Sequence, residues 1–397
     1  MPFDFSFTPD QDAFRATARA FLQREVVPIL ADMDEAEEFP AATVRRMQQE
    51  GYFGVPVPEE YGGLGLGKVG YCILLEELGK VDASHATILG AHTSLGTTPL
   101  LYFGTEAQKR RHLVPAARGE KLLAFSLTEP DSGSDSGAVH TLAERSGDGW
   151  KLTGTKLYVS NGREADAVVI LAANDPKLGP NGGVTAFLLE KGRPGFTVGR
   201  CEKKMGLHGT STAELVLDHV ELGPEEVLGP VGGGFAVAMT ALDVGRVSLG
   251  AASLGAMEAA AAAALEFAQH RVQFGQPIVQ HQAIQFKLAD MAMRIQALRY
   301  LVYHAADRQD RLGTDPHGWS REQRHDKTRE AAIVKCLGSE WAGEVIDEAL
   351  QIHGGLGYIR GTPIERAYRD ARVSEIFEGT NEIQRLVVAR DLLQRGF

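Results

Sequence analysis

The chain has 397 residues, a length at which one hydrophobic core usually gives way to two or three packed domains. Hydrophobic residues make up 44% and charged residues 23% of the chain, which is typical of a globular protein. The net charge of -11 argues against a general nucleic-acid binder, because phosphate contacts need a basic surface.

The cysteine content and the N-terminal segment bear on the cellular location. Cys72, Cys201 and Cys336 lie far apart without a C-x-x-C pair, which favours a reducing compartment over a disulfide framework or a zinc site. The first residues, MPFDFSFTPDQDAF, lack the features of a secretory or transit signal. No apolar run approaches the roughly 18 residues of a membrane-spanning helix. We therefore expect a cytoplasmic protein without membrane insertion.

Residues 1–120 are predicted to form an α-helical domain. Apolar residues such as Phe14, Ala18, Phe21 and Leu22 recur at the spacing of one helix face. Prolines and glycines interrupt this pattern at intervals, as expected where one helix ends and the next begins.

A literal G-x-G-x-x-G occurs within this domain at Gly65, Gly67 and Gly70. Such a motif binds dinucleotides where it follows a buried strand and opens a helix. The preceding residues here, PVPEEYGGL, contain two prolines and two adjacent acids, which do not suit a buried strand. We therefore interpret the motif as a flexible loop before a helix.

Residues 121–232 are predicted to form a central β domain. Short runs such as LLAFSL, WKLTGTKLYVS, AVVILAA and TAFLLE are separated by Gly, Asn and Pro. Short strands with frequent turn signals are typical of a compact β-barrel or sandwich.

Residues 233–397 are predicted to form a four-helix bundle. Four helical segments follow one another, at residues 242–269, 282–307, 329–351 and 383–394. The expected fold is therefore α+β, with an N-terminal helical domain, a central β domain and a C-terminal bundle.

Two segments of the β domain carry residues that suit a polar cofactor. In residues 125–135, FSLTEPDSGSD, the hydroxyls of Thr128 and Ser134 can donate to carbonyl or phosphate oxygens. Residues 156–162, KLYVSNG, add the ring of Tyr158, which could pack on a planar group. An ordinary Ser/Thr turn explains the first segment equally well, and a plain hairpin strand is the simpler interpretation of the second.

Glu378 lies in the segment EIFEGTNEIQR, directly before a predicted helix start. Asn381 and Gln384 have the spacing of a capping box. The positive end of a helix favours an anion or a polarised carbonyl nearby, so a catalytic role is chemically reasonable. For an arbitrary glutamate, however, a solvated carboxylate that helps to cap the helix is the simpler interpretation.

Several other chemistries lose support. His270, His281 and His353 do not have a metal-binding spacing on one helix, so no metal site is expected. The chain contains no G-x-S-x-G elbow and no P-loop, which argues against acyl hydrolysis and P-loop phosphoryl transfer.

Five segments taken together and in order resemble the acyl-CoA dehydrogenase family: FSLTEPDSGSD, KLYVSNG, RVQFGQP followed by HQ, QIHGGLGY, and YRDARVSEIFEGTNEIQR. The resemblance spans nearly the whole chain. It implies the three domains described above, FAD as cofactor and a homotetramer built from dimers, with each FAD near a dimer interface.

The resemblance also implies roles for individual residues. The catalytic base would be Glu378. FAD would be bound, in part across a subunit interface, by Phe125, Leu127, Thr128, Gly133, Ser134, Tyr158, Val159, Ser160, Arg271, Gln273, Phe274, His281, Gln282, Gln351, Ile352, Gly354, Gly355, Thr380 and Glu382. The substrate would contact Ser134, Asp243, Arg246, Gly379 and Arg390.

The reaction of this family converts an acyl-CoA to a trans-2-enoyl-CoA, as a carboxylate takes the α-proton and the β-hydride moves to flavin N5. Some members carry that carboxylate at a position that is Gly245 here, which leaves Glu378 as the matching base. The backbone N–H of Glu378 would help to polarise the thioester carbonyl. Members commonly have Trp where this chain has Tyr158, and electron-transfer flavoprotein is their usual electron acceptor.

We therefore expect an acyl-CoA dehydrogenase of fatty-acid β-oxidation that acts on straight acyl chains. The alternatives are dehydrogenation of a branched-chain or carrier-protein-bound thioester, an acyl-CoA oxidase, and a non-catalytic flavin-fold scaffold. No motif sets the acyl chain length, because that length depends on the depth of a pocket between helices.

Overall fold

The N-terminal third of the computed structural model, which describes residues 6–396, is helical as predicted. α1 (Pro9–Glu25) begins where Thr8 forms a capping box with Gln11, and it buries Phe21 and Leu22 on one face. The other helices of this part are α2 (Leu30–Ala36), α3 (Ala41–Gln49), α4 (Gly67–Val81), α5 (Ala83–Gly90), α6 (Thr98–Phe103), α7 (Glu106–Gln108) and α8 (Val114–Ala117), with π-helical segments η4 (Ala91–Thr97) and η5 (Lys109–Leu113).

The glycine-rich loop leads directly into α4. Asp310, near the end of α11 (Gln282–Leu312), accepts a hydrogen bond of 2.6 Å from the backbone N–H of Lys68, in the first turn of α4. A Cβ at Gly67 would lie 2.7 Å from the same carboxylate, so this position has no room for a side chain. A carboxylate of the chain itself therefore occupies the helix N-terminus that a phosphate would need. The motif is therefore no dinucleotide site, but only Gly65 lies in the expected loop, since Gly67 and Gly70 belong to α4.

Eight strands of the middle third form one sheet in the order β6-β7-β3-β2-β4-β5-β8, and β1 pairs in parallel with β4. The strands are β1 (Leu123–Ser126), β2 (Leu142–Ser146), β3 (Gly149–Ser160), β4 (Ala167–Ala173), β5 (Val184–Glu190), β6 (Phe196–Cys201), β7 (Thr212–Leu222) and β8 (Val227–Leu228), with the short helix α9 (Pro180–Gly183) before β5.

The sheet curves over one of its own faces. β3 and β5 are separated by two strands, yet Trp150 of β3 and Phe187 of β5 pack edge to face with ring centroids 5.6 Å apart. This enclosed core agrees with the expected barrel-like domain. The opposite face of β4 packs through Val169 and Leu171 against α6 and the first turns of the long helix that follows the sheet, so β4 is buried on both faces.

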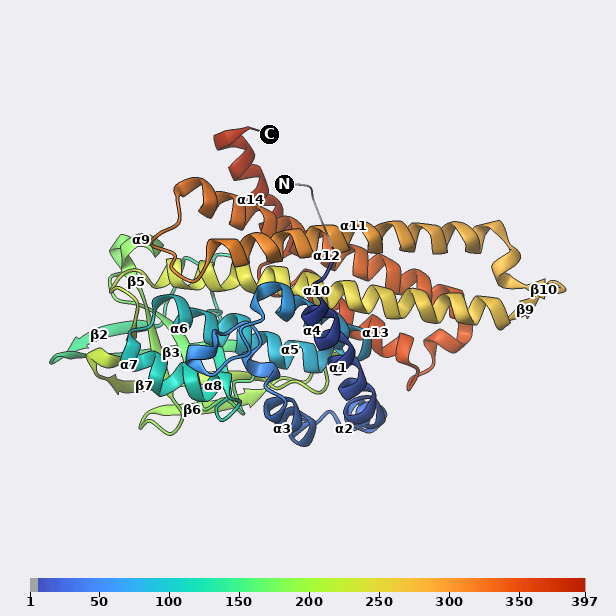
Figure 1. Ribbon diagram of the computed structural model, residues 1–397. Coiled ribbons are helices and arrows are strands. Elements are labelled where there is room, and N and C mark those ends of the chain that lie inside the picture. The colour runs from blue at the N-terminus through green and yellow to red at the C-terminus, as the bar shows by residue number, and fades with distance from the viewer. Residues whose placement is uncertain (1–5, 397) are drawn as a thin grey trace.

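Long helices make up the C-terminal part: α10 (Gly234–His270), α11, α12 (Arg321–His353) and α14 (Asn381–Arg395). Figure 1 shows α10, α11 and α12 side by side, with the hairpin of β9 (Val272–Gln273) and β10 (Gln276–Pro277) at the end farthest from the sheet. The short elements η9 (Gly354–Tyr358), α13 (Pro363–Ala371) and η10 (Arg372–Glu375) connect α12 to α14. α12 starts earlier than the predicted residue 329, because Ser320 and Gln323 form a capping box.

α10 corrects one expectation about membranes. Within the described part of the chain, this helix is long and apolar enough to cross a bilayer by length and composition alone, with a mean hydropathy of 1.3 over its most apolar window. That window is 56% buried within the protein, since α10 packs against α4, α11 and α12. The core helix of a soluble bundle has the same properties.

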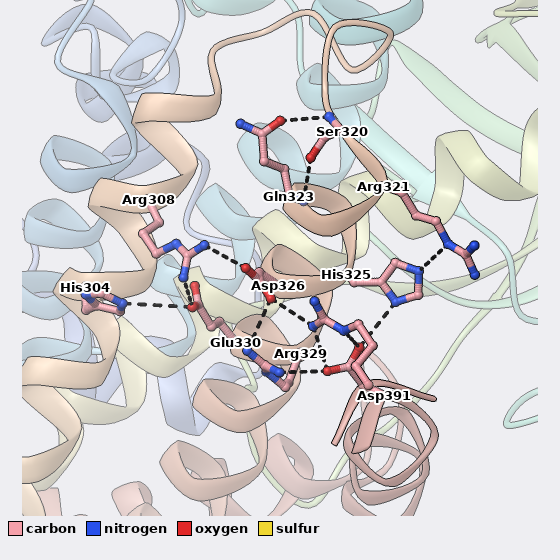
Figure 2. Close-up of polar contacts among 11 residues, drawn as sticks. His304, Arg308, Ser320, Arg321, Gln323, His325, Asp326, Arg329, Glu330 and Asp391 are labelled. Atoms are coloured by element: carbon pink, nitrogen blue, oxygen red, sulfur yellow. Dashed lines mark hydrogen bonds and ion pairs between the residues drawn. The ribbon is translucent and has the colours of Figure 1, made fainter. Parts of the chain in front are cut away.

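Ion pairs attach the C-terminal half of α14 to the rest of the bundle. Asp391 of α14 accepts hydrogen bonds from Arg329 at 2.9 Å and His325 at 3.2 Å, both on α12. Arg308 of α11 joins the same cluster through Asp326 at 3.1 Å (Figure 2). A network of several charges restrains a helix better than one exposed pair does. It thereby restrains the helix whose first turn follows Glu378.

Candidate active site

A cavity of about 1250 Å³ lies where the three parts of the chain meet. Its wall includes loop 125–137 of the sheet, the end of β3, the middle of α10, and the turn that precedes α14. Of the residues predicted for the site, it is lined by Phe125, Leu127, Thr128, Gly133, Ser134, Tyr158, Ser160, Asp243, Arg246, Glu378, Gly379, Thr380 and Arg390. Segments from distant parts of the sequence thus contribute to one cavity of the size that ligands occupy.

Glu378 stands in this wall in an unusual backbone conformation. Its φ is 56° and that of Gly379 is 89°, so two consecutive residues adopt the left-handed region. Non-glycine residues rarely adopt that region, and such strain concentrates at functional sites. Within residues 6–396, Glu378 Oε2 is buried without a hydrogen-bond partner. The carboxylate is therefore held at the cavity with an oxygen free to accept a proton.

Gly245 of α10 lies directly against this carboxylate. A Cβ at position 245 would be 2.5 Å from Glu378 Oε2 and 3.0 Å from Oε1. Ordinary van der Waals contact begins about 1 Å farther out. Gly245 therefore has two effects. It provides no carboxylate at the position where some family members carry the base, and its lack of a side chain makes the space that Glu378 occupies.

Three hydrogen bonds from side chains fix the turn that carries Glu378. Arg246 Nε donates to the carbonyl oxygen of Glu378 at 3.3 Å. Gln384 Nε2 donates to the carbonyl oxygens of Glu378 at 3.3 Å and of Gly379 at 2.9 Å. These donors stabilise the strained turn and hold the backbone of the predicted base.

The predicted capping box at the start of α14 is wrong. Thr380 is the N-cap residue and accepts from the backbone N–H of Ile383 at 3.4 Å. Asn381 is the first helical residue, and Gln384 binds the preceding carbonyls instead of reaching back to it. The sequence pattern placed the helix start one residue too late, because Thr and Asn both serve as caps.

Asp243 and Arg246 line the cavity but already bind each other. Arg246 Nη1 lies 3.0 Å from Asp243 Oδ1, and both side chains are buried. The other oxygen of Asp243 lies 3.2 Å from Lys327 Nζ and accepts a hydrogen bond of 2.7 Å from Thr328. The carboxylate of Asp243 is therefore occupied in orienting Arg246, and its contact with a substrate stays a prediction.

Burial makes Glu378 a stronger base than an ordinary glutamate. It raises the pKa of Glu378 to about 7, while the positive charges of Arg246 and Lys335 act in the opposite direction. The side chain is surrounded by protein atoms, although part of its surface faces the cavity. A carboxylate with a pKa near 7 is matched to proton abstraction at neutral pH.

A buried ion pair shapes the other wall of the cavity. Lys156 of β3 and Glu129 of the 125–135 loop are both buried and lie 2.6 Å apart. Lys156 Nζ also donates to the carbonyl oxygen of Leu127 at 3.2 Å, and the backbone N–H of Leu157 donates to Thr128 O at 2.9 Å. The loop that lines the cavity is thus fixed to the strand that carries Tyr158.

Tyr158 faces the cavity because β3 is irregular at this point. The register between β3 and β7 shifts between Lys156 and Val159, and Tyr158 has a φ of 57°. Its side chain is 61% exposed, whereas that of Val159 points into the core of the sheet at 2% exposure. A β-bulge thus redirects the aromatic ring towards the site, whereas Val159 does not line the cavity.

The free polar groups of this wall suit a flavin. Within the described residues, the hydroxyls of Thr128, Ser134 and Ser160 line the cavity and have no hydrogen-bond partner in the chain. A Cβ at Gly133 would meet nothing within 4 Å, so the loop leaves open space beside these hydroxyls. Phe125 and the ring of Tyr158 provide apolar surface next to them. Hydrogen-bond donors beside flat apolar surface fit the polar edge and the faces of an isoalloxazine ring.

The remaining predicted residues lie away from this cavity. Phe267 near the end of α10 stacks on His353 at the end of α12, with centroids 4.6 Å apart, so both helices end at one place. The predicted dinucleotide residues lie in the last turn of α12, follow the ends of α10 and α12, or adjoin the start of α11: Arg271, Gln273, Phe274, His281, Gln282, Gln351, Ile352, Gly354 and Gly355. Phe274 at the hairpin tip is 94% exposed. Glu382 is exposed in the first turn of α14, close to the cavity residue Thr380.

Sequence reasoning missed several residues of the site. Glu129 and Lys156 stand inside the recognised segments, but their pairing depends on two strands that lie apart in the sequence. Lys335 stands in α12 without any motif and is fully buried. A lysine within the apolar pattern AAIVKCLG was the available signal, because lysine is almost never fully buried unless it is paired.

Comparison with known proteins agrees with this arrangement. Family models match residues 8–120 (acyl-CoA dehydrogenase, N-terminal domain), 124–220 (middle domain) and 232–393 (C-terminal domain). An acyl-CoA dehydrogenase of Bacillus subtilis (strain 168) is 43% identical over 97% of this chain and 98% of its own.

Two solved structures are also similar, each with a TM-score of 0.93. A chain from a structure of the electron transferring flavoprotein of Acidaminococcus fermentans is 42% identical, covering 99% of this chain and 100% of its own. Butyryl-CoA dehydrogenase from Megasphaera elsdenii is 41% identical, covering 98% of this chain and 100% of its own. From these matches and the site geometry, the chain belongs to the acyl-CoA dehydrogenase family.

Proposed function

We propose that Glu378 is the base that removes the α-proton of a short, straight-chain acyl-CoA. The chain is an FAD-dependent oxidoreductase of the family named above. The observation that carries the assignment of the base is the carboxylate of Glu378, which faces the cavity with one oxygen unpaired and a pKa raised by burial to about 7. This proposal makes the chain a dehydrogenase of fatty-acid oxidation.

The residues around the cavity have separate tasks in this proposal. Bound FAD supplies the acceptor for the hydride that leaves the β-carbon. Glu378 takes the α-proton, and its backbone N–H, which has no partner in the described chain, donates to the thioester carbonyl. Arg246 and Gln384 keep that N–H and the carboxylate in place by binding the carbonyl oxygen of the same residue.

The other wall would bind the cofactor. The hydroxyls of Thr128 and Ser160 supply hydrogen bonds to it, and Tyr158 covers its ring. Ser134 and the exposed Arg390 line the cavity and would contact the CoA part of the substrate, whereas Asp243 acts through Arg246. Replacement of the usual tryptophan by Tyr158 keeps an aromatic surface over the ring.

The preference for a short chain rests on the relatives. Butyryl-CoA, the substrate in the name of the Megasphaera protein, has a four-carbon acyl group. A branched-chain or carrier-protein-bound thioester is the competing substrate, and the experiment below separates the three.

The assembly and the electron acceptor are part of the same proposal. We propose a homotetramer in which a neighbouring subunit completes the FAD site, supported by the exposed Phe274 and Tyr358 beside the predicted dinucleotide residues. We also propose electron-transfer flavoprotein as the acceptor, supported by the similarity to a chain in a structure of that system. The three unpaired cysteines support a cytoplasmic location.

The test is anaerobic titration of the FAD-loaded protein with acyl thioesters, followed by flavin absorbance. We expect bleaching by butyryl-CoA at the lowest concentration, weaker bleaching by longer and branched acyl-CoAs, and none by a butyryl carrier protein. Glu378→Gln should bind FAD as the parent does but reduce it about 10³-fold more slowly. Rapid bleaching of that variant would show that another group is the base.

A further inference from the structure

Lys335, in the middle of α12, is a fully buried lysine with no role in the mechanism described so far. Its Nζ donates a hydrogen bond of 2.7 Å to Asn381 Oδ1. Asn381 is also buried, and its amide nitrogen donates to Ser339 Oγ at 2.9 Å. A buried ammonium group is costly unless it is paired, so a neutral amide oxygen is a weak partner for it.

Glu378 is the carboxylate whose charge acts most strongly on Lys335. Burial lowers the pKa of Lys335 to about 8, and the charge of Glu378 acts in the opposite direction. The charge of Lys335, after that of Arg246, likewise acts against the rise that burial causes in the pKa of Glu378. Asn381 follows Glu378 by three residues and begins α14, so Lys335 also binds the backbone segment that carries the base.

The other charges near this pair are few. The charge of Arg246 on α10 acts on both Glu378 and Lys335. Burial raises the pKa of Tyr71 on α4, and the charge of Glu378 raises it further. Glu375 and Cys336 are the other titratable groups that act on Lys335. Arg246 shares the carboxylate of Asp243 with Lys327, at 3.0 Å and 3.2 Å, whereas Lys335 has no carboxylate in hydrogen-bond contact within the described residues.

We propose that Lys335 is a positioning residue for the catalytic base: it holds the start of α14 through Asn381, and its positive charge favours the ionised Glu378 carboxylate at the cavity. This inference rests on the proposed role of Glu378. It assigns the lysine an electrostatic task that a hydrogen bond alone could not perform, because a neutral donor would fix Asn381 but would not favour the charged form of a buried carboxylate.

Two variants separate the charge from the hydrogen bond. Lys335→Gln removes the charge and keeps a donor for Asn381, whereas Ser339→Ala removes a hydrogen-bond partner of Asn381 and keeps the charge. The measurement is the rate of flavin reduction by butyryl-CoA at low concentration, from pH 5.5 to 9, which reports the pKa of the free enzyme's base.

For Lys335→Gln, we expect this kinetic pKa to rise by about one unit, which lowers the rate about tenfold below the pKa and leaves the rate at high pH nearly unchanged. For Ser339→Ala, we expect the kinetic pKa of the parent. A profile of Lys335→Gln that overlies the parent's would overturn the inference. If Lys335→Gln does not fold, the double variant that also carries Glu378→Gln should fold, because it no longer has the buried, unpaired carboxylate of Glu378.

A double variant that also fails to fold would show that Lys335 acts independently of Glu378 and would overturn the inference.

Failure of this inference differs from failure of the proposed base. If Glu378→Gln is inactive while Lys335→Gln keeps the parent profile, only the role of Lys335 is wrong. If Glu378→Gln reduces flavin rapidly, the base itself is wrong.

Discussion

Gly245→Ala is expected to slow flavin reduction without unfolding the protein. The added Cβ would lie 2.5 Å from Glu378 Oε2, so the carboxylate must move by about 1 Å to reach ordinary contact. A misplacement of that size costs about 10²-fold in rate, which corresponds to about 2.7 kcal/mol at the transition state. Gly245 lies within α10, where alanine is favoured over glycine by up to about 1 kcal/mol, so the strain of the contact is partly offset in the folded state.

The assay for this variant is anaerobic rapid mixing with butyryl-CoA, with thermal unfolding and FAD content measured on the same preparation. Gly318→Ala is the matched control, because a Cβ there would meet nothing closer than 3.6 Å and the residue does not line the cavity. A Gly245→Ala enzyme that reduces flavin at the parent rate would refute the placement of the carboxylate against α10.

Three further predictions concern the pH profile, the flavin wall and the acyl pocket. Glu378 must be ionised to accept a proton, and its pKa is about 7. The value of kcat/KM should therefore fall tenfold for each pH unit below about 7 and be constant above it. A flat profile from pH 5.5 to 9 would contradict this prediction. Lys156→Met should destabilise the fold by about 3–5 kcal/mol and weaken FAD binding, because it leaves Glu129 buried and unpaired. Adding Glu129→Gln to the same chain should recover much of the loss. Urea unfolding measures the stability, and flavin-fluorescence titration measures the binding of FAD. Gly90 lines the cavity, and a Cβ at this position would meet nothing within 4 Å. Gly90→Leu should therefore lower kcat/KM for octanoyl-CoA at least about tenfold more than for butyryl-CoA. An unchanged ratio of these two kcat/KM values would place the acyl chain elsewhere.

Much of the fold could be predicted because each part has its own local periodicity. The 3.6-residue spacing before residue 120, the short runs with turn residues, and the long helical segments after residue 232 are each visible within a few tens of residues. The limits of the three domains stay a prediction. The element ends were less accurate, since α12 begins at Arg321 after a capping box of Ser320 that the polar composition of the preceding loop concealed.

The candidate site could likewise be predicted only in part. Glu378 and the 125–135 loop stood in recognisable segments, and the structure brings both to one cavity. The residues predicted for the dinucleotide lie at the far end of the bundle, and their role stays a prediction together with that of the neighbouring subunit.

The sequence by itself determined the order of helical and β segments, the residue types available for catalysis, and the exclusion of a dinucleotide motif, because these depend on neighbours within a few residues. Only the tertiary structure decided that Gly245 makes room for the Glu378 carboxylate, that Asp243 is occupied by Arg246, and that Lys335 binds the segment that carries the base. The first and third of these join residues about 130 and 45 positions apart, which no local pattern encodes. Asp243 and Arg246 stand only three positions apart on α10, but their burial at the cavity depends on how the helices pack.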